Sequence, residues 1–333
     1  MSSRLFGVGI EGAELSPVER EIFAENPPWG VILFRRNIET VAQLAGLVAK
    51  VRGLGARYLF LDQEGGPVDR LKDLLSPLPS FQSVARTGRS RRAGELAGAS
   101  LARLGFDIDL APVVDRSVPE AGAAVLGERS ASNDPGEVLR AAGEFLDGLH
   151  STGIGGCLKH FPGLGRARLD THEALPVLEA NTHQEALDLA PFDALMAKAQ
   201  AIMISHAAGP DGVPASLSDV KATMLLRERL GFDGAAFSDD LEMGALAAFG
   251  DLPERCVRAA MAGCDLLFVC RQIERYPACV EAVERSVPLS RRLEATGRLE
   301  DYARHLADLR TAAPAPVSTI AELTEKLRAF GEA

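Results

Sequence analysis

The sequence predicts an α/β protein, and within that class a TIM (β/α)8 barrel. Eight short apolar segments follow one another along the chain, and most of the stretches between them carry apolar residues at three- and four-residue intervals. Eight strands alternating with helices imply a parallel sheet, and eight strands close such a barrel. The chain of 333 residues is long enough for one barrel, which typically needs about 250 residues.

The expected strands are short apolar runs, and the expected helices are amphipathic. The strands are expected at residues 5–10, 30–34, 58–61, 106–114, 154–158, 201–204, 234–237 and 265–269. The helices are expected at residues 41–51, 92–104, 135–150, 184–198, 220–230 and 253–262, followed by 291–310 and 320–330.

The chain is expected to form a single domain over residues 1–333, with the barrel at about 5–270 and a C-terminal helical extension at about 271–333. A doubly wound open sheet is the structural alternative. Such sheets usually carry a glycine-rich GxGxxG turn after the first strand, whereas this turn reads Gly9-Ile10-Glu11-Gly12. The barrel is therefore the better interpretation.

Composition excludes several classes of function. The formal net charge of −10 argues against a nucleic-acid partner. No apolar run approaches the roughly 20 residues of a membrane span, and the N-terminus lacks the apolar stretch of a signal peptide. The five cysteines show no CxxC spacing, so we expect reduced thiols in a cytoplasmic protein, without a zinc site. No cofactor is expected, and the sequence carries no signal for an oligomeric state.

Polar side chains follow most of the predicted strands. In TIM barrels the catalytic groups lie at the carboxyl ends of the strands. The residues at these ends are Arg35, Arg36 and Asn37; Asp62, Gln63 and Glu64; Asp115 and Arg116; Lys159 and His160; Ser205 and His206; Ser238, Asp239 and Asp240; and Cys270 and Arg271. Solvated loops would explain polarity alone, but a rim rich in Asp, Arg and His predicts an active site.

The segment from Lys159 to His172 combines a strand end, a glycine-containing loop and an Asp/His pair. Asp170 and His172 are two residues apart, which brings their side chains together in an extended loop. A carboxylate bonded to one imidazole nitrogen fixes the tautomer and raises the basicity of the other nitrogen, as a proton shuttle requires. The alternative is a loop in which both side chains only face solvent.

Two further segments carry candidate site residues. Gly65 and Gly66 allow close approach of the backbone to a ligand, and Arg70 returns a cation to the rim, although a structural ion pair between Asp62 and Arg70 is the simpler interpretation. Asp239 and Asp240 are strand neighbours, so only one is expected to face the barrel mouth. A carboxylate there can act as nucleophile, base or metal ligand, but HxH and HExxH metal patterns are absent.

Several sequence blocks resemble, in order and position, those of a known family. The blocks are Gly30-Val31-Ile32-Leu33-Phe34, Asp62-Gln63-Glu64-Gly65-Gly66, Ala111-Pro112-Val113-x-Asp115, Gly127-Glu128-Arg129-Ser130, Lys159-His160-Phe161-Pro162-Gly163-x-Gly165, Asp170-Thr171-His172, and Phe237-Ser238-Asp239-Asp240-Leu241-x-Met243. Together they are similar to the signature of bacterial family 3 β-N-acetylglucosaminidases, over about residues 5–270.

The resemblance implies a retaining, exo-acting hydrolase that removes terminal N-acetylglucosamine from peptidoglycan-derived fragments through a covalent glycosyl-enzyme intermediate. It implies that Asp239 is the nucleophile, that His172 is the general acid and then the base, and that Asp170 orients His172. The positions that match sugar-binding residues of the family are Asp62, Arg70, Arg129, Lys159 and His160. Relatives with β-glucosidase activity generally carry a second domain, and the expected single domain favours the N-acetylglucosaminidase branch.

The chain departs from the family pattern within the loop. Leu164 stands where the family usually has a second histidine, and Arg166 and Arg168 make the loop more basic. These arginines are expected to solvate the loop, with contact to an acidic leaving group as the alternative. The glycines predict that the loop moves in after substrate binds. Two other functions remain as alternatives: a non-catalytic sugar-binding relative, and a Schiff-base lyase that uses Lys159.

Overall fold

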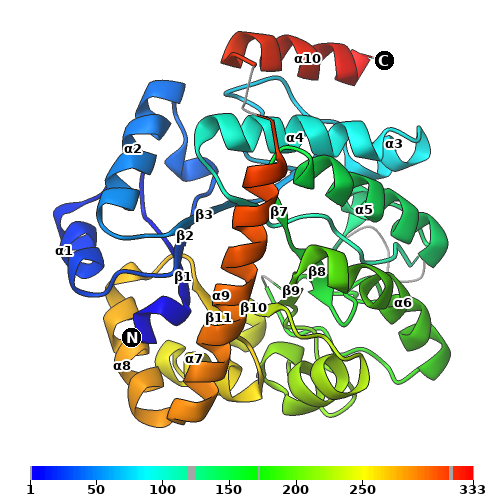
Figure 1. Ribbon diagram of the computed structural model, residues 1–333. Helices are drawn as coiled ribbons and strands as arrows, with labels where there is room; N and C mark the ends of the chain where they lie inside the picture. The colour runs from blue at the N-terminus through cyan, green and yellow to red at the C-terminus, as the bar shows by residue number, and fades with distance from the viewer. Residues whose placement is uncertain (1, 119–124, 172, 315–317, 333) are drawn as a thin grey trace.

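The computed structural model describes residues 2–118, 125–171, 173–314 and 318–332. Within these ranges one nine-stranded sheet forms the centre, and helices surround it (Figure 1). Its strands are β1 (Phe6–Gly9), β2 (Gly30–Ile32), β3 (Tyr58–Leu61), β6 (Ile108–Asp109), β7 (Gly155–Gly156), β8 (Leu158–Phe161), β9 (Ala201–Ile204), β10 (Ala235–Asp240) and β11 (Leu266–Val269).

All neighbouring strands of this sheet run parallel, in the order β7-β6-β3-β2-β1-β11-β10-β9-β8. β7 and β8 stand at opposite ends of this order, yet only Cys157 separates them along the chain. The Cys157 N–H donates a hydrogen bond at 2.9 Å to the carbonyl of Ala111, which lies two residues after β6. The two ends of the sheet are therefore joined by the chain itself, which confirms the TIM barrel.

Helices follow the strands around the barrel, as the sequence predicts. They are α1 (Pro17–Glu25), α2 (Val41–Gly53), α3 (Phe81–Arg86), α4 (Ser90–Leu104), α5 (Pro135–His150), α6 (Thr182–Ala199), the wide helix η6 (Val220–Arg229), α7 (Leu252–Ala262), α8 (Tyr276–Ser286), α9 (Leu289–Ala312) and α10 (Ile320–Glu332). The strong N-caps explain several of the starts. Asp134, for example, accepts a hydrogen bond from the Glu137 N–H, and Pro135 occupies the first turn of α5.

Three local differences from the expected elements affect the site. The strand expected at 106–114 is regular only over β6, because Pro112 has no N–H to give to the ladder. β10 extends to Asp240, so both aspartates lie within the strand rather than after it. An unexpected antiparallel hairpin, β4 (Gln63–Gly65) with β5 (Val68–Asp69), follows β3.

Aromatic side chains fill the barrel below the carboxyl ends of its strands. Phe60 packs edge-on against Phe237 and Phe268, with ring centroids 5.9 and 5.2 Å apart. A Cβ on Gly7 would overlap the ring of Phe268, and one on Gly30 would overlap Phe60. The glycines of β1 and β2 therefore make room for large rings inside the barrel, and this dense packing supports the site above it.

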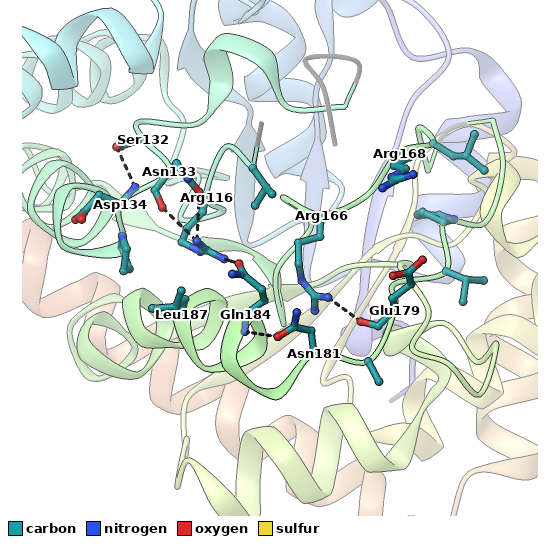
Figure 2. Close-up of a pocket in the computed structure, with 16 residues that line it drawn as sticks. Arg116, Ser132, Asn133, Asp134, Arg166, Arg168, Glu179, Asn181, Gln184 and Leu187 are labelled. Carbon is teal, nitrogen blue, oxygen red and sulfur yellow. Dashed lines mark hydrogen bonds between the residues drawn. The ribbon is translucent and has the colours of Figure 1, made fainter. Parts of the chain in front are cut away.

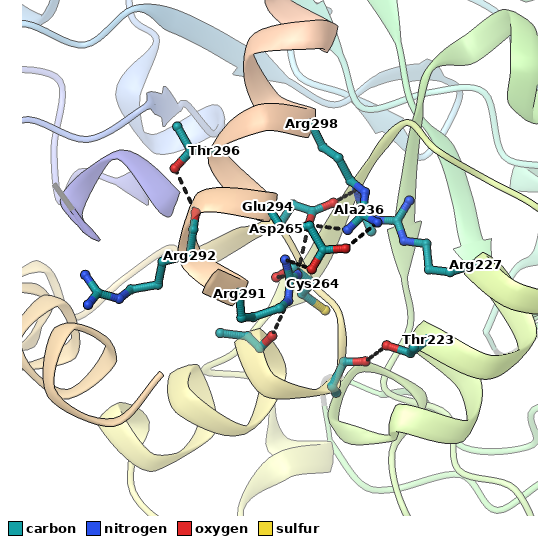
Figure 3. A network of polar contacts seen from close by, with 12 residues as sticks. Thr223, Arg227, Ala236, Cys264, Asp265, Arg291, Arg292, Glu294, Thr296 and Arg298 are labelled. Carbon is teal, nitrogen blue, oxygen red and sulfur yellow. Dashed lines mark hydrogen bonds and ion pairs between the residues drawn. The ribbon is translucent and has the colours of Figure 1, made fainter. Parts of the chain in front are cut away.

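The opposite end of the barrel is held by a buried carboxylate, Asp265, which lies just before β11 (Figure 3). Its oxygens lie 2.6 Å from Arg227, 2.8 Å from Arg291 and 3.5 Å from Arg298. It also accepts the N–H of Ala236, at the start of β10, at 2.9 Å. Because Arg291 and Arg298 belong to α9, this carboxylate ties α9 to the first residues of two barrel strands.

Candidate active site

A cavity of about 470 Å³ opens at the carboxyl ends of the strands and brings together site residues expected from the sequence. Its lining includes Asp62, Arg70, Arg129, Lys159, His160, Asp170 and Asp239. The remaining expected site residue, His172, lies outside the described residues. Residues far apart in the sequence thus meet at one end of the barrel, as expected for a TIM-barrel active site.

Lys159, on β8, is a buried cation between two carboxylates. Its Nζ lies 2.7 Å from Asp62 Oδ1 and 2.6 Å from Glu64 Oε1, and its side chain is 2% exposed. Burial acts to lower the pKa of this ammonium, but the charges of Asp62 and Glu64 outweigh burial and raise it above its ordinary value. Lys159 is therefore held as a cation. A Schiff-base lysine needs a neutral amine, so this environment works against the lyase alternative.

Glu64 is a site residue that was not among the expected sugar-binding positions. Arg129, in the short helix η4 (Gly127–Arg129), binds it through two nitrogens, with Nε–Oε2 at 2.9 Å and Nη2–Oε1 at 3.0 Å. Burial acts to raise the pKa of Glu64, but Arg129 and Lys159 outweigh it and hold the pKa well below its ordinary range. In the sequence, only its place in the charged block Asp62-Gln63-Glu64 at a strand end indicated a role for Glu64 in the site.

The β4–β5 hairpin explains how Glu64 reaches the cavity. Gly65 and Gly66 have φ of +89° and +57°, a conformation that favours glycine. Asp69 fixes the hairpin, because it accepts hydrogen bonds from Gln63 Nε2 at 2.8 Å and from the N–H of Leu78 at 2.8 Å. The double glycine therefore forms a turn that points Glu64 inward, next to Lys159.

His160 is held by Asp115 at the end of the neighbouring strand segment. Asp115 Oδ2 lies 2.7 Å from His160 Nδ1 and accepts the His160 N–H at 3.1 Å. Arg129 Nη2 lies 3.3 Å from His160 Nε2. A proton on Nδ1 satisfies both side-chain contacts, since Nε2 then accepts from the guanidinium. Asp115 thus orients the imidazole toward the cavity.

Asp62 and Arg70 do form the ion pair that was the simpler interpretation, with Arg70 Nη2 3.5 Å from Asp62 Oδ2. The pair also lines the cavity, with side chains 29% exposed for Arg70 and 14% for Asp62. Burial acts to raise the pKa of Asp62, but Lys159 and Arg70 together lower it. The carboxylate is therefore ionised, and the two interpretations are compatible.

Asp239 and Asp240 both line the cavity, so the expectation that only one of them faces the mouth was wrong. The register of β10 against β11 shifts between Phe237 and Asp240, which breaks the strict alternation of side chains. Burial, reinforced by the negative charge of Glu242, raises the pKa of Asp240 to about 7. The Asp240 carboxyl therefore holds its proton more tightly than an ordinary aspartic acid.

Asp170 reaches the cavity on the loop that follows β8. Its carbonyl accepts the N–H groups of Glu173 and Ala174, both at 3.0 Å. The next carbonyl, that of Thr171, accepts the N–H of Ala245 at 3.1 Å. Because Ala245 follows β10, this bond holds the Asp170 segment near the loop that continues from Asp239.

The middle of this loop differs from the expectation for its two arginines. Arg168 is exposed, as expected for a solvated loop, but the Arg166 side chain is only 14% exposed and pairs with Asp188 of α6. The expectation that Arg166 solvates the loop was therefore wrong. Leu164 is buried in an apolar cluster with Val113 and Ala207, which explains how an apolar side chain is accommodated there.

No group of three or more His, Cys, Asp or Glu residues suited to a metal ion occurs in the described part of the chain. Among the described helices, none is long and apolar enough to cross a membrane. The cavity charges are instead balanced by arginine and lysine, which hydrogen-bond well to hydroxyl groups and carboxylates.

A titratable group close to the cavity gives a prediction for stability. Asp109 on β6 is fully buried, with Oδ1 2.9 Å from the Gln63 N–H and Oδ2 unpaired among the described residues. Burial raises its pKa to about 8. The folded state therefore holds this proton more tightly than the unfolded state, and stability falls as pH rises from about 4 toward 8.

Asp109→Asn removes this proton uptake while it keeps the size of the side chain. At pH 9 the variant is expected to be more stable than the parent by more than about 2 kcal/mol, since each pKa unit corresponds to about 1.4 kcal/mol. At pH 3, below the pKa of this group in both the folded and the unfolded state, the difference should nearly vanish. Urea unfolding at both pH values measures it, with the exposed Asp233→Asn as control. The same pH dependence of the free energy of unfolding in Asp109→Asn and the parent would contradict the prediction.

A barrel that gathers carboxylates and hydrogen-bonding cations at the carboxyl ends of its strands has the features of a glycoside hydrolase. The model of the glycosyl hydrolase family 3 N-terminal domain matches residues 8–306. The chain therefore belongs to glycosyl hydrolase family 3.

Similar proteins extend over most of the chain. A β-hexosaminidase of Tolumonas auensis is 38% identical over 273 residues, which cover 78% of this chain and 81% of that protein. A β-hexosaminidase of Pseudomonas aeruginosa is 35% identical over 285 residues, covering 83% and 85%. The solved family 3 β-N-acetylglucosaminidase from a Paenibacillus species is 30% identical, with a TM-score of 0.88 over 99% of this chain and 67% of its own.

Proposed function

We propose that this chain is an exo-acting β-N-acetylglucosaminidase that removes terminal N-acetylglucosamine from peptidoglycan-derived fragments with retention of configuration. The observation that carries the proposal is the meeting of Asp239 with Asp170 and five hydrogen-bonding residues in one cavity. The names of the similar β-hexosaminidases support an amino sugar such as N-acetylglucosamine as the substrate. We also propose that the barrel and the C-terminal helices form one cytoplasmic domain; the five buried cysteines, none in a disulfide, support that location.

In the proposed first step, a carboxylate oxygen of Asp239 attacks the anomeric carbon, and the bond to the leaving oxygen breaks. His172, oriented by Asp170, gives its proton to that oxygen. In the second step His172 takes a proton from water, the water oxygen attacks the anomeric carbon, and Asp239 is released. A histidine whose pKa is near neutrality suits both transfers.

The paired charges next to Asp239 are proposed to bind the sugar. Lys159 and Arg129 hold Asp62 and Glu64 ionised and fixed, so the cluster offers both donors and acceptors to sugar hydroxyls. Because these side chains are already tied to one another, little conformational entropy is lost when the sugar binds. His160, oriented by Asp115, adds a further polar contact.

Turnover of 4-nitrophenyl N-acetyl-β-glucosaminide tests the activity, and a fluorinated N-acetylglucosaminide that accumulates the intermediate tests the mechanism. We expect a single covalent label on the peptide that contains residues 235–240, and the β-anomer as the first product by NMR. Turnover without a label at Asp239, or with the α-anomer first, would contradict the covalent mechanism. Sugar binding without any turnover would instead identify a non-catalytic relative.

A further inference from the structure

The loop segment 162–171 lies between two cavities. Leu164, Asp170 and Thr171 line the active-site cavity, whereas Arg166, Arg168 and Leu169 line a second cavity of about 1100 Å³ (Figure 2). Asp170 stands near the end of this segment, so the contacts that hold the segment help to determine where Asp170 lies.

One buried carboxylate, Asp188 of α6, holds this segment and a neighbouring loop together. Arg166 Nε donates to Asp188 Oδ2 at 2.8 Å, and Arg116 Nε donates to Asp188 Oδ1 at 2.9 Å. The side chains of Arg116 and Asp188 are each 3% exposed. A second bond, from Arg166 Nη1 to the carbonyl of Glu179 at 2.8 Å, fixes the direction of the guanidinium. These contacts form an Arg116–Asp188–Arg166 bridge.

Arg116 is itself fixed, so the bridge has a rigid base. It donates to the carbonyl and side-chain oxygens of Asn133, each at 3.2 Å, and to Gln184 Oε1 at 2.6 Å (Figure 2). Arg116 follows Asp115, which orients His160 and accepts the Leu164 N–H at 2.7 Å. The two loops are therefore joined at Leu164 and again at Arg166.

Two glycines allow the backbones to approach closely at the bridge. A Cβ on Gly163 would lie 2.8 Å from Cβ of Asp188, and a Cβ on Gly165 would overlap the carbonyl of Arg116. Leu164 and Ala167 pack with Val113 in the apolar cluster. The glycines thus allow close packing of this segment.

We propose that Arg166 and Asp188 are positioning residues, which fix segment 162–171 and thereby hold Asp170 at the active-site cavity before substrate binds. The proposal rests on the proposed roles of Asp170 and His172. Neither Arg166 nor Asp188 lines the active-site cavity, so both act through the segment. Loss of the Asp188 charge leaves two guanidinium groups without their common counter-ion, which favours displacement of the loop.

The test uses Asp188→Asn and Arg166→Gln, with Arg168→Gln as a matched control on the same loop. Each variant is assayed with an alkyl β-N-acetylglucosaminide, whose leaving group needs a proton, and with the 2,4-dinitrophenyl glycoside, whose leaving group does not. A misplaced general acid should lower kcat/KM for the alkyl substrate about 100-fold and for the dinitrophenyl substrate less than about 3-fold. Arg168→Gln should leave both values nearly unchanged.

Equal losses on both substrates, or no loss in either variant, would overturn the positioning role. Hydrogen–deuterium exchange of peptides covering 162–171 tests the anchoring without reference to activity. Exchange should rise there in Asp188→Asn and Arg166→Gln but not in Arg168→Gln, and unchanged exchange would refute the anchoring. If the parent protein hydrolyses neither glycoside, the proposed function and the catalytic role of the bridge fail, while the exchange result still decides the anchoring.

Discussion

Asp239→Asn is expected to lower kcat by more than about 100-fold, because an amide oxygen is a poor nucleophile and forms no stable glycosyl ester. The side chain keeps its size, so the fold and the packing of β10 should persist. Asp239 lines the cavity beside Lys159 and Asp62, and the sugar should still bind there. Steady-state turnover and direct titration of N-acetylglucosamine measure the two effects separately.

Asp233→Asn is the matched control, since Asp233 is exposed and lies just before β10 at the opposite end of the strand. Its kcat should equal that of the parent. Normal turnover by Asp239→Asn would show that another group forms the bond to the sugar. Loss of sugar binding together with turnover would place Asp239 among the binding residues instead.

Lys159→Met is expected to lower both activity and stability. The substitution leaves Asp62 and Glu64 close together without the cation that now lies within 2.7 Å of each carboxylate. Each carboxylate keeps an arginine partner but loses a buried charged hydrogen bond, which costs about 1.5–3 kcal/mol of stability. The loss of charged hydrogen bonds to the sugar should lower kcat/KM at least about 100-fold. Chemical unfolding and glycoside turnover check the two effects.

The stability loss should depend on pH in a defined direction. Lys159 lowers the pKa of both carboxyls, so its contribution is present above pH 4 and disappears as falling pH protonates them. The free energies of unfolding of the parent and of Lys159→Met should therefore become equal at acidic pH. Lys198→Met, which removes a half-exposed partner of Asp147, should cost less than about 1 kcal/mol. A pH-independent deficit in Lys159→Met would point to lost packing rather than lost charge.

The barrel could be predicted from the sequence because its strands are short apolar runs whose signal is local. β3 and β9 have the expected ends, and the strand expected at 154–158 appears as β7 and β8 around Cys157. Helices α1, α3 and α8 were missed. The register shift in β10 was also missed, since it depends on pairing with β11 and not on the sequence of β10 alone.

The expected site residues that the structure describes do meet in one cavity, because they lie at the carboxyl ends of strands or on the loops that follow those ends. Their partners could not be predicted in the same way. Glu64 meets Arg129 across 65 residues of sequence, and Arg116 meets Asp188 across 72. Such pairs depend on how the loops and helices pack. The chain contains many other acidic and basic residues, so the sequence alone does not show which of them pair.

The carboxylate of Asp265 has a consequence for how the protein loses its structure. It bonds to two arginines of α9 and to the backbone of β10, and Arg310 near the end of α9 also pairs with Asp107, just before β6. Detaching α9 would therefore expose buried unpaired charges beneath strands on different sides of the barrel. We expect α9 and the barrel to unfold in the same cooperative transition. Limited proteolysis should therefore detect no stable intermediate that lacks α9.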